Sequence, residues 1–483
     1  MSFAPVIALL GWLIALFAAA MLAPVLVALG YGETRAAFVF GGTAAVTLFF
    51  GIGMMFATQG ADRTLRRGGD FLLVVVSWPV LAVFAAAPFY LLDVLATPSD
   101  AFFEALSGLT TTGATVMAAI EEQGRAVLFW RAWLQWLGGL ATIVLAVSVL
   151  PMLGIGGMEV FHGAMPHGDH ATLEARVRRS ALALSWIYAL LTLACAVALW
   201  SAGMPGFDAL AHALSTLSTG GFSTRDGGIG AFGNPMIDVV LIVFMSIGAL
   251  NFTLYWALCN GRPGALRRDP ELGWLLFLTA CATLITVVVL DVQGGLDGGD
   301  ALRQGLFATV SMITTTGYVS GVVEPWPVVL PILFLVLIYV GGSSGSTAGG
   351  IKVMRLKLVV RQGARELDRL SHPHGVVRIQ YGGTPVPERV LQALWSFFIL
   401  YIVSFAVLSV ALAMSGLDVK TAVAMALATL TNAGAGLALV AGADASYAVL
   451  PDAVKWVLSF GMLLGRLDLI TVVAVLTPAF WRR

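Results

Sequence analysis

Leu109-Thr110-Thr111-Thr112-Gly113 is a stretch that recurs in varied form three more times along this chain. The other copies are Leu217-Ser218-Thr219-Gly220-Gly221, Ile313-Thr314-Thr315-Thr316-Gly317 and Leu430-Thr431-Asn432-Ala433-Gly434. Every copy has an aliphatic residue, then Thr or Ser, then Thr or Asn, then a variable position and a final glycine. Because hydroxyls and glycine make a poor lipid-facing helix, such segments belong where the backbone faces a cavity. Four copies at nearly equal spacing indicate four quarter-walls of one pore built by a single chain.

The composition is typical of a chain that crosses a membrane many times. The 483 residues are 59% hydrophobic and 11% charged, and the mean hydropathy is +0.90. An ordinary soluble domain carries roughly 25% charged residues. We therefore predict a polytopic integral membrane protein that contacts the lipid bilayer. The formal net charge of zero excludes a polybasic nucleic-acid binder, so no nucleic-acid partner is expected.

Ten apolar segments reach the length of about 20 residues that a helix needs to span a bilayer. They fall near residues 4–30, 36–58, 71–95, 127–153, 180–203, 235–259, 272–291, 328–352, 388–415 and 453–478. The first segment is too long for the apolar part of a signal peptide, and no positive charge precedes it. We therefore expect it to be the first membrane helix.

Four shorter apolar segments, near residues 100–112, 207–220, 300–316 and 418–433, each run into one copy of the repeated phrase. Segments of that length are candidate re-entrant helices. The sequence thus predicts an all-α integral membrane fold of four tandem helix–re-entrant pore loop–helix units, arranged pseudo-fourfold around one pore. We expect an N-terminal helix pair at residues 1–68, followed by pore units at residues 69–165, 166–265, 266–370 and 371–483.

The positions of the basic residues set the expected orientation. With ten spans and both termini in the cytoplasm, most of the 27 Lys and Arg residues fall in inner loops and the tail. The outer side then holds only Arg35, Arg125, Arg131, Arg225, Arg303, Lys420 and Lys455, and Arg466 falls inside a span. All four repeated phrases open outward in this arrangement.

An aspartate lies near the start of each short segment, and we expect these aspartates to act as helix N-caps. They are Asp100, Asp208, Asp300 and Asp418. Each short helix then aims its partially negative C-terminal end at the pore centre, which favours a cation. An extended backbone of hydroxyl residues and glycine supplies carbonyl oxygens that replace a cation's hydration shell. The alternative is a decayed duplication without function, which four copies disfavour because each lies after a short helix and before a spanning helix.

Further motifs show a family resemblance that covers most of the chain. They are Leu134–Gly139 (LQWLGG), Leu150–Gly154 (LPMLG), Gly345–Lys352 (GSTAGGIK), Leu463–Asp468 (LLGRLD) and Thr477–Trp481 (TPAFW). With these motifs the chain resembles the pore subunits of Trk-type potassium uptake systems, in the Trk/Ktr/HKT superfamily. The additional N-terminal helix pair is similar to Trk proteins rather than to the shorter Ktr subunits.

The resemblance implies a potassium filter built from the four phrases. Its expected residues are Thr110, Thr111, Thr112, Gly113, Ser218, Thr219, Gly220, Gly221, Thr314, Thr315, Thr316, Gly317, Thr431, Asn432, Ala433 and Gly434. Sodium-favouring relatives carry serine at the position of Gly113, so we expect K⁺ as the substrate, with Rb⁺ accepted and Na⁺ transported weakly. No covalently bound cofactor is expected. The fourth copy departs from the family pattern, because Ala433 and Ala435 stand where Thr and Pro are usual.

Ten small residues inside the eighth span would break a helix and expose backbone polar groups. They are Gly341, Gly342, Ser343, Ser344, Gly345, Ser346, Thr347, Ala348, Gly349 and Gly350. One interpretation is a close-packed stretch of small residues. The other is a flexible intramembrane loop below the filter, which the resemblance implies is a gate.

Arg466 is the second candidate gate residue, because an arginine inside a span is unfavourable unless it faces a cavity or a partner. A salt bridge to Asp468 is disfavoured, since residues i and i+2 do not share a helix face. The resemblance implies that Arg466 projects into the pore as a barrier to cations. The alternative is a structural residue that pairs elsewhere.

Partners and location follow mainly from the resemblance. The segment from Lys352 to Arg389 is basic and broken by prolines, so alone it predicts a solvated loop near anionic lipid. The resemblance implies docking there of a cytosolic nucleotide-binding regulator of the RCK type (TrkA-like), homodimerisation, and a bacterial cytoplasmic (inner) membrane.

Other chemistries find little support in the sequence. His162, His167, Asp169 and His170 share one inner loop, but a solvated loop explains them better than a metal site. The three cysteines lack metal-ligand spacing and are expected to be small buried residues without disulfides. We find no catalytic set, so the chain is not expected to be an enzyme. A transporter that couples potassium to protons or sodium stays open, although the spans carry few acids for such coupling.

Overall fold

The computed structural model describes residues 3–60, 67–146, 173–321, 326–372, 378–437 and 447–481, and most of these residues are helical. Within them, seven apolar stretches are long enough to cross a membrane as uninterrupted spans. They are α1 with α2 (Ala4–Ala20 and Leu22–Gly30), α3 (Thr34–Ala57), α4 (Arg67–Leu91), α6 (Arg125–Val144), α8 (Leu173–Ser201), α13 (Leu272–Val292) and α17 (Glu388–Met414). The chain is therefore a multi-pass membrane protein.

Two predicted spans are bent helix pairs rather than straight helices. Helices α10 (Pro235–Gly248) and α11 (Phe252–Cys259) meet at 90°, and α20 (Asp452–Arg466) and α21 (Leu469–Leu476) meet at 116°. The first bend lies at Asn251, whose side chain caps α11 by accepting from the Thr253 N–H. The second lies at Asp468, which has a left-handed φ of 64°.

The eighth predicted span, residues 328–352, is helical only in its first half. Helix α15 (Val329–Val340) ends at Gly341, whose φ of 73° is a conformation that L side chains rarely adopt. Residues 341–352 then run as irregular backbone, and residues 341–349 are all buried. The predicted interruption of this helix by small residues is thus present.

Four short helices precede the repeated phrase, as the sequence predicts. They are α5 (Pro98–Leu109), α9 (Gly206–Leu217), α14 (Gly298–Ile313) and α18 (Val419–Leu430). Each ends directly before the first Thr or Ser of its phrase. In all four copies the residue that follows the helix lies in a turn, so the helix ends at the same position of the repeated phrase.

The expected N-caps are right only for Asp418, whose carboxylate accepts from the Thr421 N–H. Helix α5 is capped by Thr97, while α9 and α14 have no side-chain cap at Pro205 and Asp297. The other predicted caps, Asp100, Asp208 and Asp300, lie in the first turns of their helices. A carboxylate there still interacts favourably with the helix dipole, but a residue already inside the helix cannot act as its N-cap.

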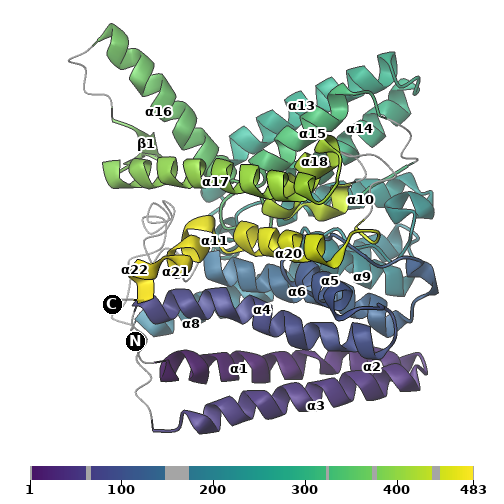
Figure 1. Cartoon of the computed structure of the whole chain (residues 1–483). Helices are drawn as coiled ribbons and strands as arrows, with labels where there is room; N and C mark the ends of the chain where they lie inside the picture. The colour runs from purple at the N-terminus through teal and green to yellow at the C-terminus, as the bar shows by residue number, and fades with distance from the viewer. Residues whose placement is uncertain are drawn as a thin grey trace.

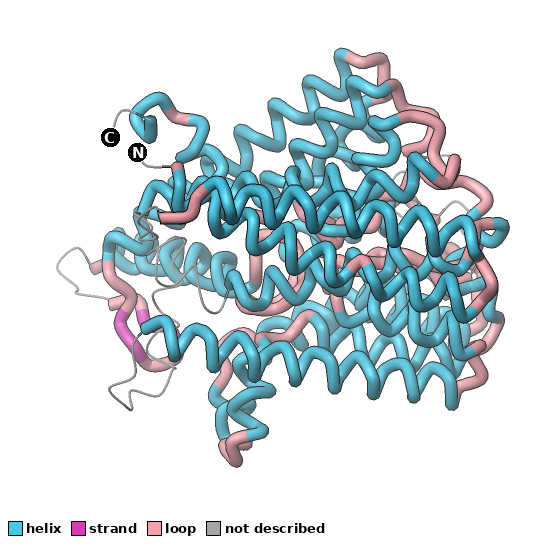
Figure 2. The backbone as a smooth tube through the Cα atoms, turned by 90° about the horizontal axis from the view of Figure 1, so that it is seen from below, coloured by secondary structure: helices cyan, strands magenta, loops and turns pink. Residues whose placement is uncertain are grey.

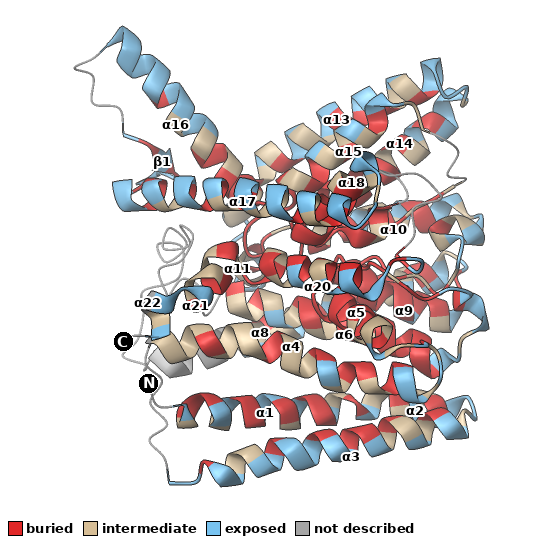
Figure 3. Ribbon diagram, viewed as in Figure 1, coloured by how far each residue is buried: buried red, intermediate tan, exposed pale blue. Residues whose placement is uncertain are grey.

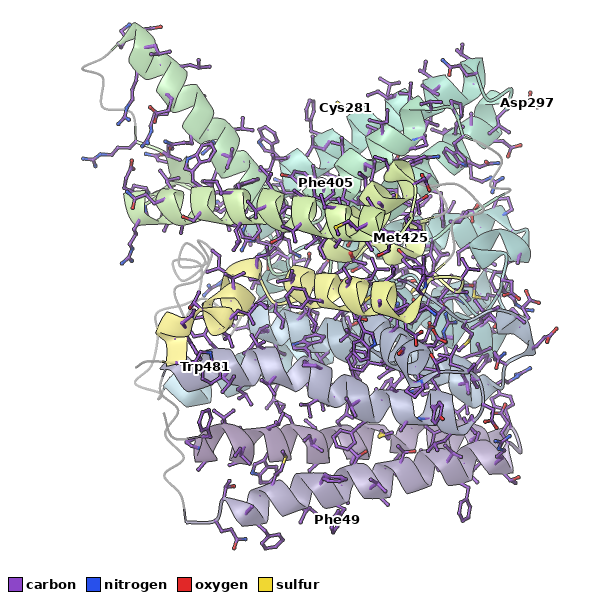
Figure 4. All side chains as sticks on the ribbon, in the orientation of Figure 1. Phe49, Cys281, Asp297, Phe405, Met425 and Trp481 are labelled. Carbon is purple, nitrogen blue, oxygen red and sulfur yellow. The ribbon has the colours of Figure 1, made fainter. Side chains whose placement is uncertain are left out.

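The N-terminal pair packs on one side of the body, with α3 outermost (Figure 1). Helices α1 and α3 approach closely through two glycines, since a Cβ added at Gly11 would lie 2.8 Å from the Gly51 carbonyl oxygen. Exposed residues concentrate on the outer face of α3, whereas the helices around α5, α6 and α9 are largely buried (Figure 3). Phe49 on α3 points away from the body, as expected of a side chain that faces lipid (Figure 4).

The basic segment after Lys352 is mostly helix rather than the predicted solvated loop. Helix α16 (Val353–Ser371) is followed by a two-stranded antiparallel hairpin of β1 (Gln380–Tyr381) and β2 (Thr384–Pro385). Both pack through a cluster of buried side chains against the start of α17. Basic residues and prolines had suggested a loop, but Met354 and Leu358 bury one face of α16.

Both ends of the described chain lie at the same end of the helical body. The rings of Phe3 and Trp481 have centroids 6.4 Å apart, and the last helix is the short α22 (Pro478–Trp481). Helix α16 and the hairpin also lie at that end, opposite Asp297 (Figures 1 and 4). The remaining short elements are α12 (Gly264–Arg268) and the 3₁₀ turns η1 (Ile120–Glu122), η4 (Gly228–Phe232) and η5 (Gly434–Gly436).

Candidate functional site

The four repeated phrases meet in the interior of the protein, where irregular backbone crosses the middle of the helical body (Figure 2). All sixteen predicted filter residues are buried. Each final glycine is too close to the next copy to carry a side chain. A Cβ would lie 2.0 Å from Gly220 O at Gly113, 1.9 Å from Thr316 O at Gly221, 2.4 Å from Gly436 N at Gly317, and 2.7 Å from Ala114 Cβ at Gly434. The contacts run from copy one to two, three, four and back to one, so the phrases form a closed ring, which we call the filter ring.

The backbone repeats from copy to copy. The second residue after each short helix has a left-handed φ, at 53° for Thr111, 51° for Thr219, 59° for Thr315 and 52° for Asn432. The final glycines of the first three copies are also left-handed, at 75°, 79° and 80°. Such a conformation is strained for other residues, which explains the glycine at those positions.

The first hydroxyl of each phrase faces back to its own helix. Each donates to the carbonyl four residues earlier: Thr110 to Leu106 and Thr314 to Val310 at 2.8 Å, Ser218 to Leu214 at 2.9 Å, and Thr431 to Leu427 at 2.8 Å. These side chains anchor the phrase to the short helix. The hydroxyls are therefore engaged, which leaves backbone carbonyls as candidate cation ligands. Of these, Ser218 O already accepts from the Thr219 hydroxyl and Thr431 O from the Gly350 N–H.

The fourth copy differs from the other three. Gly434 belongs to the 3₁₀ turn η5 and lacks the positive φ of its counterparts. The Ala435 N–H donates to the Thr112 carbonyl oxygen at 3.2 Å. The Ala435 Cβ lies 2.8, 2.7 and 2.9 Å from the positions that a Cβ would take at Gly113, Gly221 and Gly317. The methyl group of Ala435 is thus centred among the other three copies.

A buried ion pair supports the ring from behind. Arg131 Nε and Glu104 Oε1 are 2.8 Å apart, with both side chains almost fully buried. Glu104 also accepts from the Val116 N–H and the Thr115 hydroxyl, and Arg131 donates to the Ser223 carbonyl. The pair therefore fixes the backbone just beyond the first two copies. Sequence reasoning missed it, although a Glu and an Arg inside apolar helices were a visible signal.

The Leu134–Gly139 motif has a role in the same packing. Gln135 Oε1 accepts from the Ser215 hydroxyl at 2.5 Å and from the Phe222 N–H at 3.2 Å. A Cβ at Gly138 would lie 1.8 Å from the Leu109 carbonyl oxygen, so only glycine fits beside the end of α5. The two hydrogen bonds to Gln135 and the close approach at Gly138 explain why the motif has glutamine and glycine at these positions.

The segment 341–350, which we call the intramembrane loop, lies against three copies of the ring. The Thr347 hydroxyl is 3.0 Å from Leu217 O at the end of α9, and the Gly349 N–H donates to the Thr315 hydroxyl at 2.6 Å. The Gly350 N–H donates to the Thr431 carbonyl at 3.0 Å. All these partners belong to the ends of the short helices and the first residues of the phrases. The loop therefore lies against the side of the ring that faces the short helices' ends.

Arg466 contacts the intramembrane loop directly, since its Nη1 donates to the Thr347 carbonyl at 2.9 Å. The guanidinium is buried, and its Nε and Nη2 have no hydrogen-bond partner among the described residues. Asp468 pairs instead with Arg355 at 2.6 Å, so the expectation of no Arg466–Asp468 bridge is confirmed. Arg466 is thus a buried cation with one neutral partner and no acidic partner in the described chain.

Several other predicted features have different outcomes. Cys195 is buried as expected, but Cys259 and Cys281 are exposed on surfaces of apolar helices, and all three are free thiols. The histidine-containing loop at 162–170 and the LPMLG motif at 150–154 lie outside the described residues. Within the described ranges, no group of three or more His, Cys, Asp or Glu side chains is placed to hold a metal ion.

Comparisons with known proteins agree with this architecture. The family model for TrkH, described as a cation transport protein, matches residues 36–482. The chain is 42% identical to the Trk system potassium uptake protein TrkH of Vibrio parahaemolyticus and 40% identical to that of Escherichia coli, each over 100% of both chains. It is 35% identical to TrkG of Escherichia coli over 98% of this chain and 97% of that one. The crystal structure of the potassium transporter TrkH from Vibrio parahaemolyticus superposes with a TM-score of 0.91 over 100% of both chains.

Proposed function

The chain belongs to the TrkH family of cation transport proteins, and from this premise we propose that it takes up potassium through the filter ring. The family consists of transporters rather than enzymes, and relatives of the chain are Trk system potassium uptake proteins. The observation that carries the proposal is the closed ring of four phrases, three of which have left-handed backbone at alternate positions.

The filter acts on a cation through backbone carbonyls. Hydroxyls of Thr110, Ser218, Thr314 and Thr431 are engaged with their own helices, which leaves main-chain oxygens to replace water around the ion. The short helices add the negative ends of their dipoles at the same place. Potassium is the substrate and rubidium is accepted, while sodium is transported weakly; no covalently bound cofactor takes part.

Conduction is controlled below the ring by the intramembrane loop and Arg466. The loop bonds to three of the four copies, so a cation that leaves the ring on that side meets the loop first. The Arg466 guanidinium donates to the Thr347 carbonyl of the loop, and its positive charge repels the same cation. Movement of the loop and of Arg466 away from the axis opens the path.

The wider arrangement follows from the same proposal. Seven spans, two bent pairs and the half-span of α15 make ten crossings, arranged pseudo-fourfold around the ring. Phe3 and Trp481 lie at one end of the body, which fits an even number of crossings and two cytoplasmic termini. We place the protein in the bacterial cytoplasmic membrane as a homodimer. Other Trk components, among them a cytosolic nucleotide-binding regulator, dock at the end that carries α16.

Channel-type conduction fits the ring better than coupled transport does. Coupling to protons or sodium normally uses an ionisable group near the middle of the membrane. Three buried carboxylates near the phrases are paired with arginines, Glu104 with Arg131, Asp208 with Arg225 and Asp238 with Arg303, whereas Glu271 beside the intramembrane loop is bonded to neutral donors.

Rubidium flux into proteoliposomes, measured with voltage and pH gradients imposed separately, tests the proposal. We expect voltage-driven flux that potassium competes with and that persists without a pH gradient. Each 100 mV contributes about 2.3 kcal/mol per charge, so the dependence on voltage is steep. Flux that requires a proton gradient, or that sodium supports as well as rubidium, contradicts the proposal.

A further inference from the structure

Glu271 is a buried carboxylate that contacts both the intramembrane loop and the β1–β2 hairpin. It precedes α13, and only 1% of its surface is exposed. Its Oε2 accepts from the Ser344 N–H of the intramembrane loop at 2.7 Å. Its Oε1 accepts from the Tyr381 hydroxyl of the β1–β2 hairpin at 2.7 Å. One side chain thus receives a hydrogen bond from each segment, although the donors Ser344 and Tyr381 are far apart in sequence.

The hairpin end of this connection is firmly packed. Tyr381 is buried in a cluster with Met354 and Leu358 of α16 and Leu394 of α17. The Val386 N–H donates to the Ile379 carbonyl at 2.9 Å, which closes the hairpin. A displacement of α16 or the hairpin therefore moves the Tyr381 hydroxyl rather than being absorbed by a loose side chain.

The loop end is held differently. The hydroxyl of Ser344 has no hydrogen-bond partner among the described residues, so its backbone N–H is the polar group that fixes it. The neighbouring Ser343 N–H donates to Ala249 O at 2.9 Å, and Thr347 carries the contacts to Leu217 and Arg466. The hydrogen bond from the Ser344 N–H is therefore the contact through which Glu271 positions the part of the loop below the ring.

A buried carboxylate is unfavourable unless its oxygens receive hydrogen bonds. Loss of either donor leaves the other to stabilise the charge alone, so the two contacts support each other energetically. The nearby charges are Asp269, which precedes α13, and Lys352, two residues after the loop. Lys357 of α16 is also close, because its ammonium donates to the Pro270 carbonyl at 2.6 Å.

We propose that Glu271 is a positioning residue that couples the β1–β2 hairpin to the intramembrane loop. Glu271 holds Ser344 in place while the Tyr381 hydroxyl donates to it, and the loop is released when a shift of α16 and the hairpin breaks that hydrogen bond. This inference rests on the proposed function in one respect, namely that the loop obstructs the pore. The coupling itself is a property of the two hydrogen bonds and is measurable without ion flux.

The test uses the full chain in lipid nanodiscs, with Tyr381→Phe as the main variant. This change removes one hydroxyl group and keeps the buried aromatic side chain, so we expect the fold to be retained. Tyr401→Phe is the matched control, because the Tyr401 hydroxyl is buried without a partner among the described residues. Hydrogen–deuterium exchange of the peptide that contains residues 341–350 reports the loop directly, and rubidium flux in proteoliposomes reports the pore.

We expect Tyr381→Phe to speed exchange of the loop amides about tenfold, the usual effect of losing one hydrogen bond to a charged group. Rubidium flux without any partner rises in the same variant, and Tyr401→Phe changes neither measurement. Glu271→Ala gives at least the same increase in exchange, and Tyr381→Phe adds nothing further in that background. This non-additivity separates coupling from two independent losses of stability.

The possible results distinguish the two proposals. Equal loop exchange in Tyr381→Phe and Tyr401→Phe overturns the coupling, whatever the flux. Additive effects of the Tyr381 and Glu271 changes overturn it as well. Faster loop exchange with no rubidium flux in any variant upholds the coupling and contradicts the proposed function instead.

Discussion

Replacement of Arg466 by alanine is the change from which we expect the largest gain in potassium flux. The guanidinium donates to Thr347 O at 2.9 Å, and the Thr347 hydroxyl lies 3.0 Å from the Leu217 carbonyl at the end of α9. Two hydrogen bonds on Thr347 thus link the guanidinium to the end of α9, and its separation from a cation at the lower edge of the filter ring is on the order of 9 Å. No acidic partner in the described chain neutralises it.

Two unit charges about 9 Å apart repel by about 1.8 kcal/mol at an effective dielectric constant of about 20. Removal of that repulsion raises the rate of ion exit about twentyfold, if this step limits conduction. Loss of the bond to Thr347 also loosens the loop, which acts in the same direction. We therefore expect Arg466→Ala to conduct rubidium at least tenfold faster than the original chain.

The assay is uptake of radioactive rubidium into proteoliposomes at a fixed membrane potential, normalised to the amount of folded protein. Arg466→Lys is the matched control, since it keeps the positive charge but cannot reproduce the guanidinium geometry. We expect its flux to stay within about threefold of the original, because its charge keeps most of the repulsion. If Arg466→Ala conducts no faster than the original chain while folding normally, or if both variants conduct equally, the electrostatic barrier is refuted.

Three further predictions follow from the site. Arg131→Met leaves Glu104 buried without its cation and should destabilise the protein by about 3–5 kcal/mol, measured as a lower Tm in detergent; the double variant with Glu104→Gln should recover part of the loss. Ala435→Val should lower rubidium flux about tenfold and Ala435→Gly should raise it, because the methyl lies at the centre of the ring; equal flux in both would contradict that position. Burial raises the pKa of Glu271 from 4.5 to about 7, so loop release that hydrates the carboxyl should also release a proton. The closed state is then favoured at low pH, and flux should rise as cytoplasmic pH increases from about 5 to about 7 and level off above; Glu271→Gln should flatten this profile.

Sequence reasoning succeeded where the signal is carried by a few neighbouring residues. The four short helices end directly before their phrases, and Gly113, Gly221 and Gly317 take the left-handed conformation that favours glycine. The break after Val340 was also predictable, because ten successive small residues cannot sustain a membrane helix. The length, apolar character and backbone preference of each segment depend only on the residues of that segment.

It failed where the outcome depends on which distant segments meet. Asp208 was expected to cap α9, but it pairs with Arg225 beyond the second phrase. The basic segment after Lys352 was read as a loop because the apolar face of α16 has meaning only against α17 and the hairpin. The Glu104–Arg131 pair was invisible as a pair, since the two residues belong to different helices.

The sequence by itself determined that this is a membrane protein with four related re-entrant segments, since hydropathy and turn chemistry act over fewer than about 25 residues. Only the tertiary structure decided how those segments close into a ring, which copy differs in conformation, and what lies beneath them. Contacts such as Glu271 with Ser344 and Tyr381 depend on side-chain packing across the whole body. No local preference specifies them, because a residue's neighbours in space are chosen by burial and hydrogen bonding of the entire chain.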